Sequence, residues 1–332
     1  MVTIAIDAMG GDHGPRVTVP AALSALEAHS DLNILLYGNR AKLDHYLNDS
    51  TASTRLKIIH TDEAVSSGER SSGALRKKQS SMRLAVDSVK NEEADALVSA
   101  GNTGALVAIS RYVLKTMLGI DRPALIARLP NVYGFSYMLD LGANVECDSE
   151  NLHQFAVMGS AYASAIGEIQ TPKVALLNIG SEEIKGNEDI RLANAILKDS
   201  ECLNYVGYVE GDDLYKGIAD VIVTNGFAGN IALKSSEGLL SFTTHMVRKA
   251  FKKNIFTRVI GLFALPVLDS LRLASEPDLK SGGVLLGVQG IVVKSHGKSQ
   301  KCAFENAIDG AYRLAKNKLL QQIAEMLDDE ML

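Results

Sequence analysis

The sequence predicts a three-layer α/β/α fold built on a mainly parallel, mixed sheet. Short apolar runs alternate with helical patterns along the 332 residues, which is typical of parallel strands covered by helices on both faces. Several of these runs lead into glycine-rich turns, where the ligand sites of such sheets lie. No low-complexity linker and no repeat of fixed period interrupts the pattern. We therefore expect a single domain over residues 1–332.

The expected strands are short and rich in β-branched residues, and the expected helices carry apolar residues at helical spacing. The strand ranges are 3–6, 33–37, 56–59, 96–99, 125–127, 136–139, 174–179, 205–209, 220–224 and 284–293, the last long enough for two strands. The helix ranges are 17–28, 40–47, 75–89, 106–116, 152–166, 190–197, 231–252 and 303–326.

The composition indicates an ordinary globular protein with ample core, since 46% of the residues are hydrophobic. The formal net charge of -5 argues against nucleic-acid binding, which favours a basic surplus. Cys147, Cys202 and Cys302 stand far apart, so we expect reduced cysteines. The chain starts directly with a strand pattern, so we expect no signal peptide. The longest largely apolar run, 259–268, is below the roughly 20 residues that span a bilayer.

The segment 220–238 combines a buried strand, a glycine turn and the start of a helix. The run 221–223 is β-branched without polar alternation, which favours a strand buried on both faces. Unpaired N–H groups and the helix dipole meet at such a turn and attract anions. The candidate residues of this turn, T-N-G-F-A-G-N, are Asn225, Gly226, Gly229 and Asn230.

Two further strands lead into comparable loops. The strand at 2–6 precedes D-A-M-G-G-D-H-G-P, and the strand at 96–99 precedes A-G-N-T-G-A and a helix. Because loops that follow parallel strands meet at one edge of the sheet, we expect them to converge on one cleft. Their candidate substrate-binding residues are Asp7, Gly10, Gly11, Asp12, Gly101, Asn102, Thr103 and Gly104.

The loop N-I-G-S-E-E-I-K-G-N-E follows another buried strand and carries one lysine among its acids. It is either an acidic surface loop in which Asn187 caps a helix, or a cover that holds Lys185 over the cleft as an anion clamp, with Gly180 in the same loop. The segment D-L-G-A-N, residues 140–144, has two equally supported interpretations: it caps a helix, or it lines the same cleft, with Asn144 as its candidate site residue.

Two histidines stand in glycine loops. His13 lies between Asp12 and Gly14, and this setting is compatible with catalysis or with a structural role. His296, in S-H-G-K-S, lies in a turn, where a lone histidine is more often a surface hydrogen-bonding group than a catalyst. Both are candidates for proton transfer.

Several enzyme classes are excluded by missing motifs. The first loop lacks the G-x-G-x-x-G spacing, and Tyr37-Gly38-Asn39 offers no acid for a ribose hydroxyl, so a nicotinamide-dependent dehydrogenase is a weak alternative. The chain has no G-x-x-x-x-G-K-[ST], G-x-S-x-G or H-E-x-x-H motif. We expect no metal and no cofactor.

The segment 239–275 is predicted to protrude as an amphipathic helical piece. An apolar stripe runs along its first half, changes phase after Lys253-Asn254, and continues through Ile255, Phe256, Val259, Ile260 and Phe263. No acid occurs between Glu237 and Asp269. The segment is either a core or dimer-interface helix pair, or a surface that contacts an anionic membrane. A membrane-docking scaffold without catalysis is a further alternative, although it would not need the polar glycine loops.

Taken in order, six motifs resemble those of one family, the bacterial phosphate acyltransferases of phospholipid synthesis. They are D-A-M-G-G-D, S-A-G-N-T-G-A, D-L-G-A-N, N-I-G-S-E-E-I-K-G-N-E, T-N-G-F-A-G-N and K-S-H-G-K-S. The resemblance implies transfer of a fatty acyl group from acyl-[acyl carrier protein] to inorganic phosphate. It also implies a fold like that of isocitrate and isopropylmalate dehydrogenases and of phosphate acetyltransferases. A cytoplasmic homodimer, loosely membrane-associated and feeding a membrane glycerol-3-phosphate acyltransferase, is implied as well.

The reaction that the resemblance implies needs no enzyme nucleophile, because phosphate itself attacks the thioester. The protein must then position phosphate and stabilise an oxyanion. We assign these roles to Lys185 and Asn230, and leaving-thiolate protonation to His13. The remaining glycine-loop residues and His296 are expected to line the site.

Overall fold

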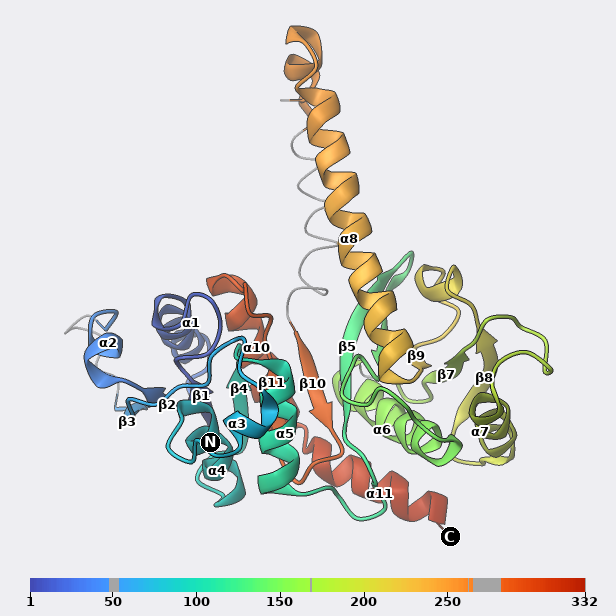
Figure 1. Cartoon of the computed structure of the whole chain (residues 1–332), viewed down its shortest axis with the longest axis horizontal. Helices are drawn as coiled ribbons and strands as arrows, with labels where there is room; N and C mark the ends of the chain where they lie inside the picture. The colour runs from blue at the N-terminus through green and yellow to red at the C-terminus, as the bar shows by residue number, and fades with distance from the viewer. Residues whose placement is uncertain (48–53, 168, 262, 265–281, 332) are drawn as a thin grey trace.

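The computed structural model describes residues 1–47, 54–167, 169–261, 263–264 and 282–331. Within these residues, eleven strands form one sheet in the order β3-β2-β1-β4-β11-β10-β5-β6-β9-β7-β8 (Figure 1). Their bounds are β1 Val2–Asp7, β2 Leu32–Gly38, β3 Leu56–His60, β4 Ala96–Ser99, β5 Ala124–Asn131, β6 Gly134–Leu139, β7 Lys173–Leu177, β8 Asn204–Val209, β9 Val221–Val223, β10 Gly283–Leu286 and β11 Ile291–Lys294. Every expected strand range forms a strand, and 284–293 contains two.

The sheet consists of two parallel halves joined by antiparallel strands. Strands β3, β2, β1, β4 and β11 pair in parallel, and so do β6, β9, β7 and β8. Between the halves, β10 pairs antiparallel with both β11 and β5, and β5 pairs antiparallel with β6. The predicted mixed, mainly parallel sheet is therefore confirmed.

Helices cover both faces of this sheet, as the buried strands require. Their bounds are α1 Pro15–Ala28, α2 Arg40–Asp44, α3 Ser71–Ala74, α4 Ser81–Lys90, α5 Thr103–Leu114, α6 Ser149–Gly167, α7 Glu188–Asp199, α8 Gly226–Phe251, α10 Lys301–Lys316 and α11 Leu319–Met331. In β1, Ile4 and Ile6 join one core with α1, α6 and α10, whereas Ala5 joins a second core with α4 and α5. A third core lies between the other half of the sheet and the base of α8. These cores join the sheet to the helices on its two faces, which gives the three layers of the fold.

Two expected helices are broken in the structure. The range 75–89 contains a loop and then α4, whose first turn is capped by the Ser80 hydroxyl accepting from the N–H of Arg83. The range 303–326 divides into α10 and α11 because Lys318 adopts a left-handed conformation, with φ of 54°. The apolar pattern continues across both breaks, so periodicity alone did not reveal them.

Helix α8 extends far beyond the sheet (Figure 1). Its 26 residues correspond to about 39 Å at 1.5 Å per residue. The helix ends at Phe251, and a new helical turn begins at Asn254, whose side chain accepts from the N–H of Thr257. This break lies where the apolar stripe changes phase. The part of the expected protrusion at 265–275 lies outside the described residues.

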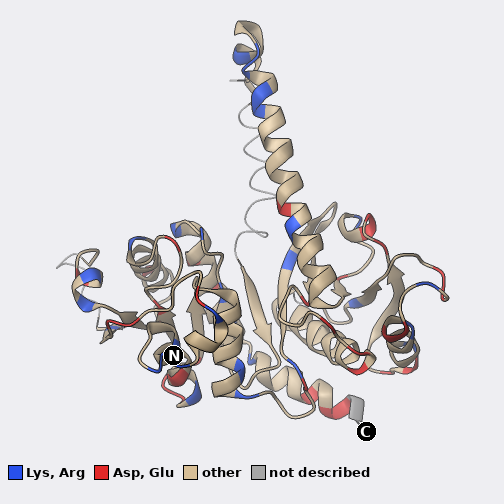
Figure 2. Cartoon of the chain, in the orientation of Figure 1, with Lys and Arg blue, Asp and Glu red and all other residues tan. Residues whose placement is uncertain are grey.

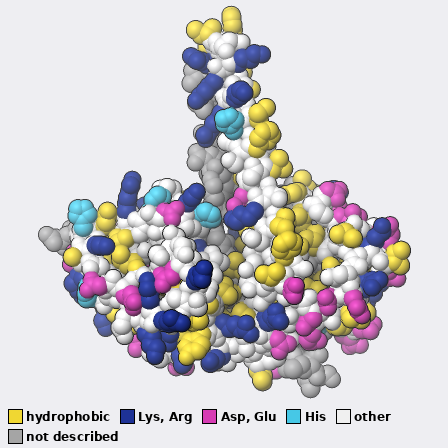
Figure 3. Space-filling model, in the orientation of Figure 1, with side chains coloured by type: hydrophobic (Ala, Val, Ile, Leu, Met, Phe, Trp, Pro, Cys, Tyr) yellow, Lys and Arg dark blue, Asp and Glu magenta, His cyan; other side chains and the backbone are white. Residues whose placement is uncertain are grey.

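Leu240, at the base of this protrusion, packs against the third core, whereas most of the large apolar side chains farther along its described part are exposed. Phe242 and Phe263 are 61% and 83% exposed, for example. Basic side chains surround the distal part of the helix, and apolar side chains gather at its tip (Figures 2 and 3). Among the described residues, no helix has the length and apolar character needed to cross a membrane.

Candidate functional site

The six sequence motifs form two groups at the carboxyl ends of parallel strands. The first loop cluster comprises residues 7–14, 99–104 and 294–299, which follow β1, β4 and β11. The second loop cluster comprises residues 140–145, 178–187 and 224–230, which follow β6, β7 and β9. The antiparallel strands β10 and β5 stand between the two groups in the sheet order, although Lys234 of α8, the helix that follows the second group, lines the cleft of the first.

A row of three polar residues crosses the first loop cluster. Asp7 pairs with Ser99 in the β1–β4 register, and Ser99 pairs with Lys294 in the β4–β11 register. Residues at one register position of parallel strands face the same side of the sheet. Asp7, Ser99 and Lys294 are all buried. The row therefore places a carboxylate, a hydroxyl and an ammonium next to each other at the end of the sheet.

The carboxylate of Asp7 is held by two hydroxyls. Ser81 donates to one oxygen at 2.6 Å, and Ser99 donates to the other at 2.7 Å. Burial raises the pKa of Asp7, and the two hydrogen bonds oppose that rise. A Cβ at Gly10 would lie 2.6 Å from an Asp7 oxygen, so this glycine is needed for close packing around the carboxylate. Asp7 thus fixes the position of the loop that follows β1, because Gly10 of this loop packs closely against its carboxylate.

Lys294 is 7% exposed, and its Nζ donates to the carbonyl oxygen of Ser295. Burial lowers the pKa of its ammonium to about 8, and the negative charge of Asp7 opposes the shift. This lysine was not among the residues predicted from the sequence. Its signal was a lysine that ends an otherwise apolar buried strand, I-V-V-K, directly before a glycine loop.

His296 lies in the same loop and is half-buried. Its Nδ1 accepts from the backbone N–H of Lys298 at 3.1 Å, so the neutral ring carries its proton on Nε2. Burial lowers the pKa of His296, and the neighbouring charge of Lys234 lowers it further. The imidazole is therefore a neutral hydrogen-bond donor at neutral pH.

Lys294 and His296 line a cleft of about 820 Å³, which is large enough for a small-molecule substrate. Helix α5 contributes its N-terminus, where Asn102 accepts from the N–H of Ala105 and donates to the carbonyl oxygens of Ser67 and Glu69. Helix α8 contributes Lys234 from across the cleft. The lining residues are Met9, Gly11, Asp12, Ala64, Val65, Ser66, Ser67, Ala100, Gly101, Asn102, Thr103, Gly104, Lys234, Lys294, His296 and Gly297.

The second loop cluster is anchored by the carboxylate of Asp140. It accepts from the backbone N–H groups of Leu125, Gly142, Ala143 and Asn144 at 2.6–3.2 Å. Burial raises the pKa of Asp140, whereas these hydrogen bonds lower it. The carboxylate therefore holds the D-L-G-A-N turn in a single conformation.

The side chain of Asn144 is used within this turn. Its Nδ2 donates to the carbonyl oxygen of Pro123 at 2.7 Å and to Asp140 at 3.0 Å. Asn144 is also buried. The side chain of Asn144 is thus used within the turn, while its carbonyl oxygen accepts from the N–H of Gly226, so this segment caps the start of α8.

The N-terminus of α8 donates mainly to the chain itself. The N–H of Gly226 donates to the carbonyl oxygen of Asn144 at 2.8 Å, and the N–H of Ala228 donates to the Asn225 side chain at 2.8 Å. Two of the first-turn donors that an anion would need are therefore already paired. The strand and helix around this turn form as expected, but its glycine loop has another use.

That use is close packing. A Cβ on Gly226 would collide with the carbonyl oxygen of Asn144, and a Cβ on Gly229 would collide with that of Asp140. Asn230 is exposed, and its side chain lies beside Gly142. Asn187 is exposed as well, so both of these asparagines are accessible to a ligand.

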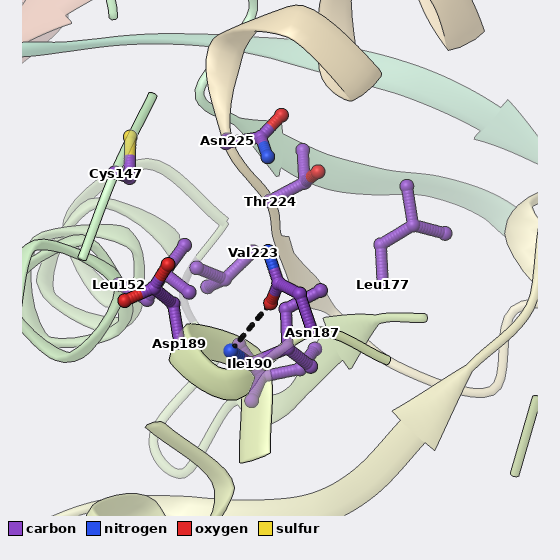
Figure 4. A pocket seen from close by; sticks show the side chains of 10 residues that line it. Cys147, Leu152, Leu177, Asn187, Asp189, Ile190, Val223, Thr224 and Asn225 are labelled. Atoms are coloured by element: carbon purple, nitrogen blue, oxygen red, sulfur yellow. Dashed lines mark hydrogen bonds between the residues drawn. The ribbon is translucent and has the colours of Figure 1, made fainter. Parts of the chain in front are cut away.

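A small cavity of about 10 Å³ lies beneath the second loop cluster (Figure 4). Asn187 and Asn225 line it, and each caps a helix, since Asn187 accepts from the N–H of Ile190. The volume suits one water at most. Cys147 also lines this cavity, and burial raises the pKa of its thiol to about 11, with a further rise from Asp140.

Lys185 is exposed on the loop after β7. Its backbone N–H donates to the carbonyl oxygen of Glu182, and its carbonyl oxygen accepts from Asn178, so the backbone of the loop is held while the ammonium faces outward. Gly180 packs against the stem of Lys185. The structure does not bring Lys185 into the lining of the large cleft.

His13, unlike His296, lies outside the lining of the large cleft. Its Nε2 lies 3.2 Å from the amide nitrogen of Gln300, at the start of α10, and His13 is not among the residues that line the cleft. The structure therefore favours His296 over His13 as the histidine that meets a ligand.

The fold defines a class of protein. It matches a phosphotransacetylase from Streptococcus pyogenes with a TM-score of 0.65, at 16% identity, over 95% of this chain and 94% of the other. It also matches a branched-chain phosphotransacylase from Enterococcus faecalis V583 with a TM-score of 0.59, at 16% identity, over 95% and 99%. A putative 4-hydroxythreonine-4-phosphate dehydrogenase from Salmonella typhimurium matches at 0.53, with 13% identity, over 95% and 99%. The chain thus has a fold shared by phosphotransacylases and a dehydrogenase.

Sequence comparison identifies the family within that class. The family described as "Fatty acid synthesis protein" matches residues 2–322. A phosphate acyltransferase from Methylococcus capsulatus is 49% identical over 99% of this chain and 98% of its own length. A second phosphate acyltransferase, from Nitrosococcus oceani, is 51% identical over 98% and 97%. The chain therefore belongs to the phosphate acyltransferase family, which confirms the resemblance found in its motifs.

Proposed function

We propose that this protein transfers a fatty acyl group from acyl-[acyl carrier protein] to inorganic phosphate, and that phosphate attacks the thioester directly. The observation that carries this proposal is the cleft, which holds Lys234, Lys294 and His296 in a member of the phosphate acyltransferase family. Such groups suit anionic substrates and a negatively charged transition state.

The chemistry follows from the groups available. A phosphate oxygen attacks the thioester carbon, the carbonyl oxygen becomes an oxyanion, and the C–S bond breaks as the carrier thiolate leaves. Asn230 and Lys185 are proposed to stabilise phosphate and the oxyanion, because both side chains are exposed at the second loop cluster. His296, rather than His13, lines the cleft, and its neutral ring is proposed to donate a hydrogen bond from Nε2–H to the leaving thiolate, which takes its proton from solvent. Cys147 is buried as a neutral thiol, which argues against an acyl-cysteine intermediate.

The acyl chain of the substrate is proposed to contact an apolar surface at the second loop cluster. The loops and first turns of the second loop cluster expose large apolar side chains that no core requires, namely Val145, Ile179, Ile184, Phe227 and Ile231. Exposed apolar groups beside a polar site suit the hydrocarbon part of a substrate.

The carrier protein is proposed to dock near residues 76–78. The Nζ of Lys77 donates to the carbonyl oxygen of Ala64, which lines the cleft, while Arg76 and Lys78 are exposed. The alternative docking site, 248–253, is also basic but lies on the distal half of α8. Rim charges mainly steer the encounter, so charge reversal at the true site should raise the apparent KM of the carrier.

The protrusion is proposed to serve the homodimer or an anionic membrane surface, from which acyl phosphate would pass to a membrane glycerol-3-phosphate acyltransferase. The exposed tip residues are Ile255, Phe256, Val259, Ile260 and Phe263. Replacing Val259 and Phe263 by Glu should abolish flotation with anionic vesicles while acyl transfer in solution continues. A double variant that unfolds or becomes monomeric would assign the stripe to packing or to the dimer instead.

The decisive experiment incubates the purified protein with palmitoyl-carrier protein and inorganic phosphate and follows the free carrier thiol. Thiol release should depend on phosphate, and acyl phosphate should form in equal amount. Release at the same rate without phosphate would contradict the proposal and indicate a hydrolase. NADH turnover with an added substrate would instead favour the dehydrogenase alternative.

A further inference from the structure

Three basic side chains line the cleft, and the proposed function assigns none of them to a particular phosphate group. Lys294 ends β11, His296 follows in the next loop, and Lys234 reaches over from α8. Lys234 and Lys294 both lower the pKa of His296, and Lys234 also lowers that of Lys294. All three side chains line the same cleft, where one ligand can meet them.

Lys294 is the central member of this group. An ammonium has three donors, and in the described part of the chain one of them goes to the carbonyl oxygen of Ser295. The nearby carboxylate of Asp7 is already bonded to Ser81 and Ser99, and it acts on Lys294 through its charge. A buried ammonium that lines a cleft is stabilised when an anion enters that cleft.

Several of the surrounding groups are donors that match an anion, although the acidic residue Asp12 also lines the cleft. The neutral His296 ring presents Nε2–H, because its Nδ1 accepts from the backbone of Lys298. Thr103 and Gly104 open the 12-residue helix α5 at the cleft wall, where the positive end of the helix dipole lies. These donors lie on a strand end, a loop and a helix start, so they surround the space rather than share one surface.

Lys234 completes the site at its rim. Its Nζ pairs with both carboxylate oxygens of Glu237 at 2.8–2.9 Å, and its side chain is 52% exposed. Such exposed pairs contribute little, so a stronger anion can draw the ammonium away from Glu237.

We propose that the part of the cleft lined by these residues is a binding site for a phosphate group, held by Lys294 and His296 at its floor, by the start of α5 at its wall and by Lys234 at its rim. The ligand chemistry is a tetrahedral phosphate oxyanion. If the proposed function holds, two substrates carry that group: inorganic phosphate, and the phosphodiester of the carrier's phosphopantetheine arm. The site itself does not depend on which of the two it takes.

The test titrates three ligands into the full-length protein by calorimetry: inorganic phosphate, 4′-phosphopantetheine, and pantetheine, which lacks the phosphate. Lys294→Met removes the charge at similar volume and should weaken one of the two phosphate ligands about 10- to 100-fold, as expected for a lost charge-assisted hydrogen bond. Pantetheine affinity should not change. Lys298→Met is the matched control, because Lys298 is exposed in the same loop and does not line the cleft.

The possible outcomes show which of the two phosphate ligands uses the site, and whether the site binds phosphate at all. Weaker inorganic phosphate binding assigns the site to the nucleophile, and weaker 4′-phosphopantetheine binding assigns it to the carrier arm. Unchanged affinity for both ligands in folded Lys294→Met would overturn the proposal. If that variant does not fold, Lys234→Met tests the same site from its exposed rim, and unchanged affinities there would overturn it equally. The readout is binding alone, so it stands apart from the outcome of the acyl-transfer assay.

Discussion

The two loop clusters follow the same kind of strand and contain the same kinds of residue, yet their hydrogen bonding differs. In the first loop cluster, the buried Asp7 is satisfied by two serines, and the basic groups above it border a cleft of about 820 Å³. In the second loop cluster, Asp140 is satisfied by backbone N–H groups of its own turn, and the cavity beneath holds about 10 Å³. One cluster is open and cationic, whereas the other is closed and bonded to itself.

The difference shows that a strand followed by a glycine turn and a helix does not by itself define an anion site. At the start of α8, the glycines allow the helix to pack on the turn 140–144, and that turn takes up donors of the helix. At the start of α5, the corresponding residues Thr103 and Gly104 border open space. What decides the use of such a motif is the neighbouring loop, which comes from a distant part of the chain.

The largest expected effect tests whether the closed cluster still takes part in catalysis through its exposed side chains. Lys185→Ala and Asn230→Ala should each lower phosphate-dependent thiol release by about 10²–10³-fold, as expected for loss of an oxyanion ligand. Both residues are exposed, so thermal unfolding should change little. Lys173→Ala is the matched control, because Lys173 is exposed at the opposite end of β7.

Near-normal rates in both variants would remove Lys185 and Asn230 from the site. The chemistry would then belong to the first loop cluster alone, and the comparison would become sharper. A control variant as impaired as Lys185→Ala would show that the effect is not local.

The second prediction concerns the anchor of the closed cluster. Asp140→Asn replaces a charged acceptor by a neutral one and introduces two donors that lack acceptors. The free energy of unfolding should fall by about 2–3 kcal/mol, since hydrogen bonds to charged groups contribute about 1.5–3 kcal/mol. Urea denaturation measures the change. A variant as stable as the parent would contradict the view that Asp140 holds this turn.

The third prediction concerns pH and the open cluster. The pKa of Lys294 lies near 8, so its charge is lost as the pH rises through 8, and phosphate affinity should then fall by up to about tenfold per pH unit. The facing groups are the Asp7 carboxylate, which raises this pKa, and Lys234, which lowers it. The affinities for inorganic phosphate and for 4′-phosphopantetheine between pH 7 and 9.5 measure the effect, and constant affinity for both ligands would contradict it.

Titration of Lys294 would not unfold the protein over this pH range, so unfolding does not explain a loss of phosphate affinity. Because its pKa is lowered in the folded state, the unfolded chain binds more protons between about pH 8 and the ordinary lysine pKa. The contribution of Lys294 to the free energy of unfolding therefore rises with pH in that window. Circular dichroism over the same range serves as the control.

The strands could be predicted from the sequence because each is a short, buried, β-branched run, and β9 is the clearest case. The grouping of the loops could not, because it depends on β10 and β5, which insert antiparallel between the halves. Their apolar composition is the same for either strand direction. Strand order is a non-local property that periodicity does not contain.

The candidate site could be predicted only in part, because the pairing of distant residues is also a non-local property. The glycine loops were found, and those at 101–104 do line the cleft. Lys294 was missed because its importance comes from its register with Ser99 and Asp7, which only strand pairing reveals. The side chain of Asn144 donates a hydrogen bond to the carboxylate of Asp140, and the spacing of the two residues in the sequence does not reveal this bond. Residue type was predictable, whereas the partner of each residue was not.

The smallest expected effect concerns the cysteines, and it tests whether either cluster supplies a nucleophile. Cys202 and Cys302 are exposed and line neither cavity, so their replacement by Ala should leave the rate within about twofold. Cys147 is buried, and its pKa of about 11 leaves almost no thiolate at neutral pH. Cys147→Ala should cost about 1 kcal/mol of stability through the lost buried sulfur and still support thiol release at the parental rate. A folded but inactive Cys147→Ala variant would instead make the closed cluster the place of a covalent acyl intermediate, and direct attack by phosphate would then have to be abandoned.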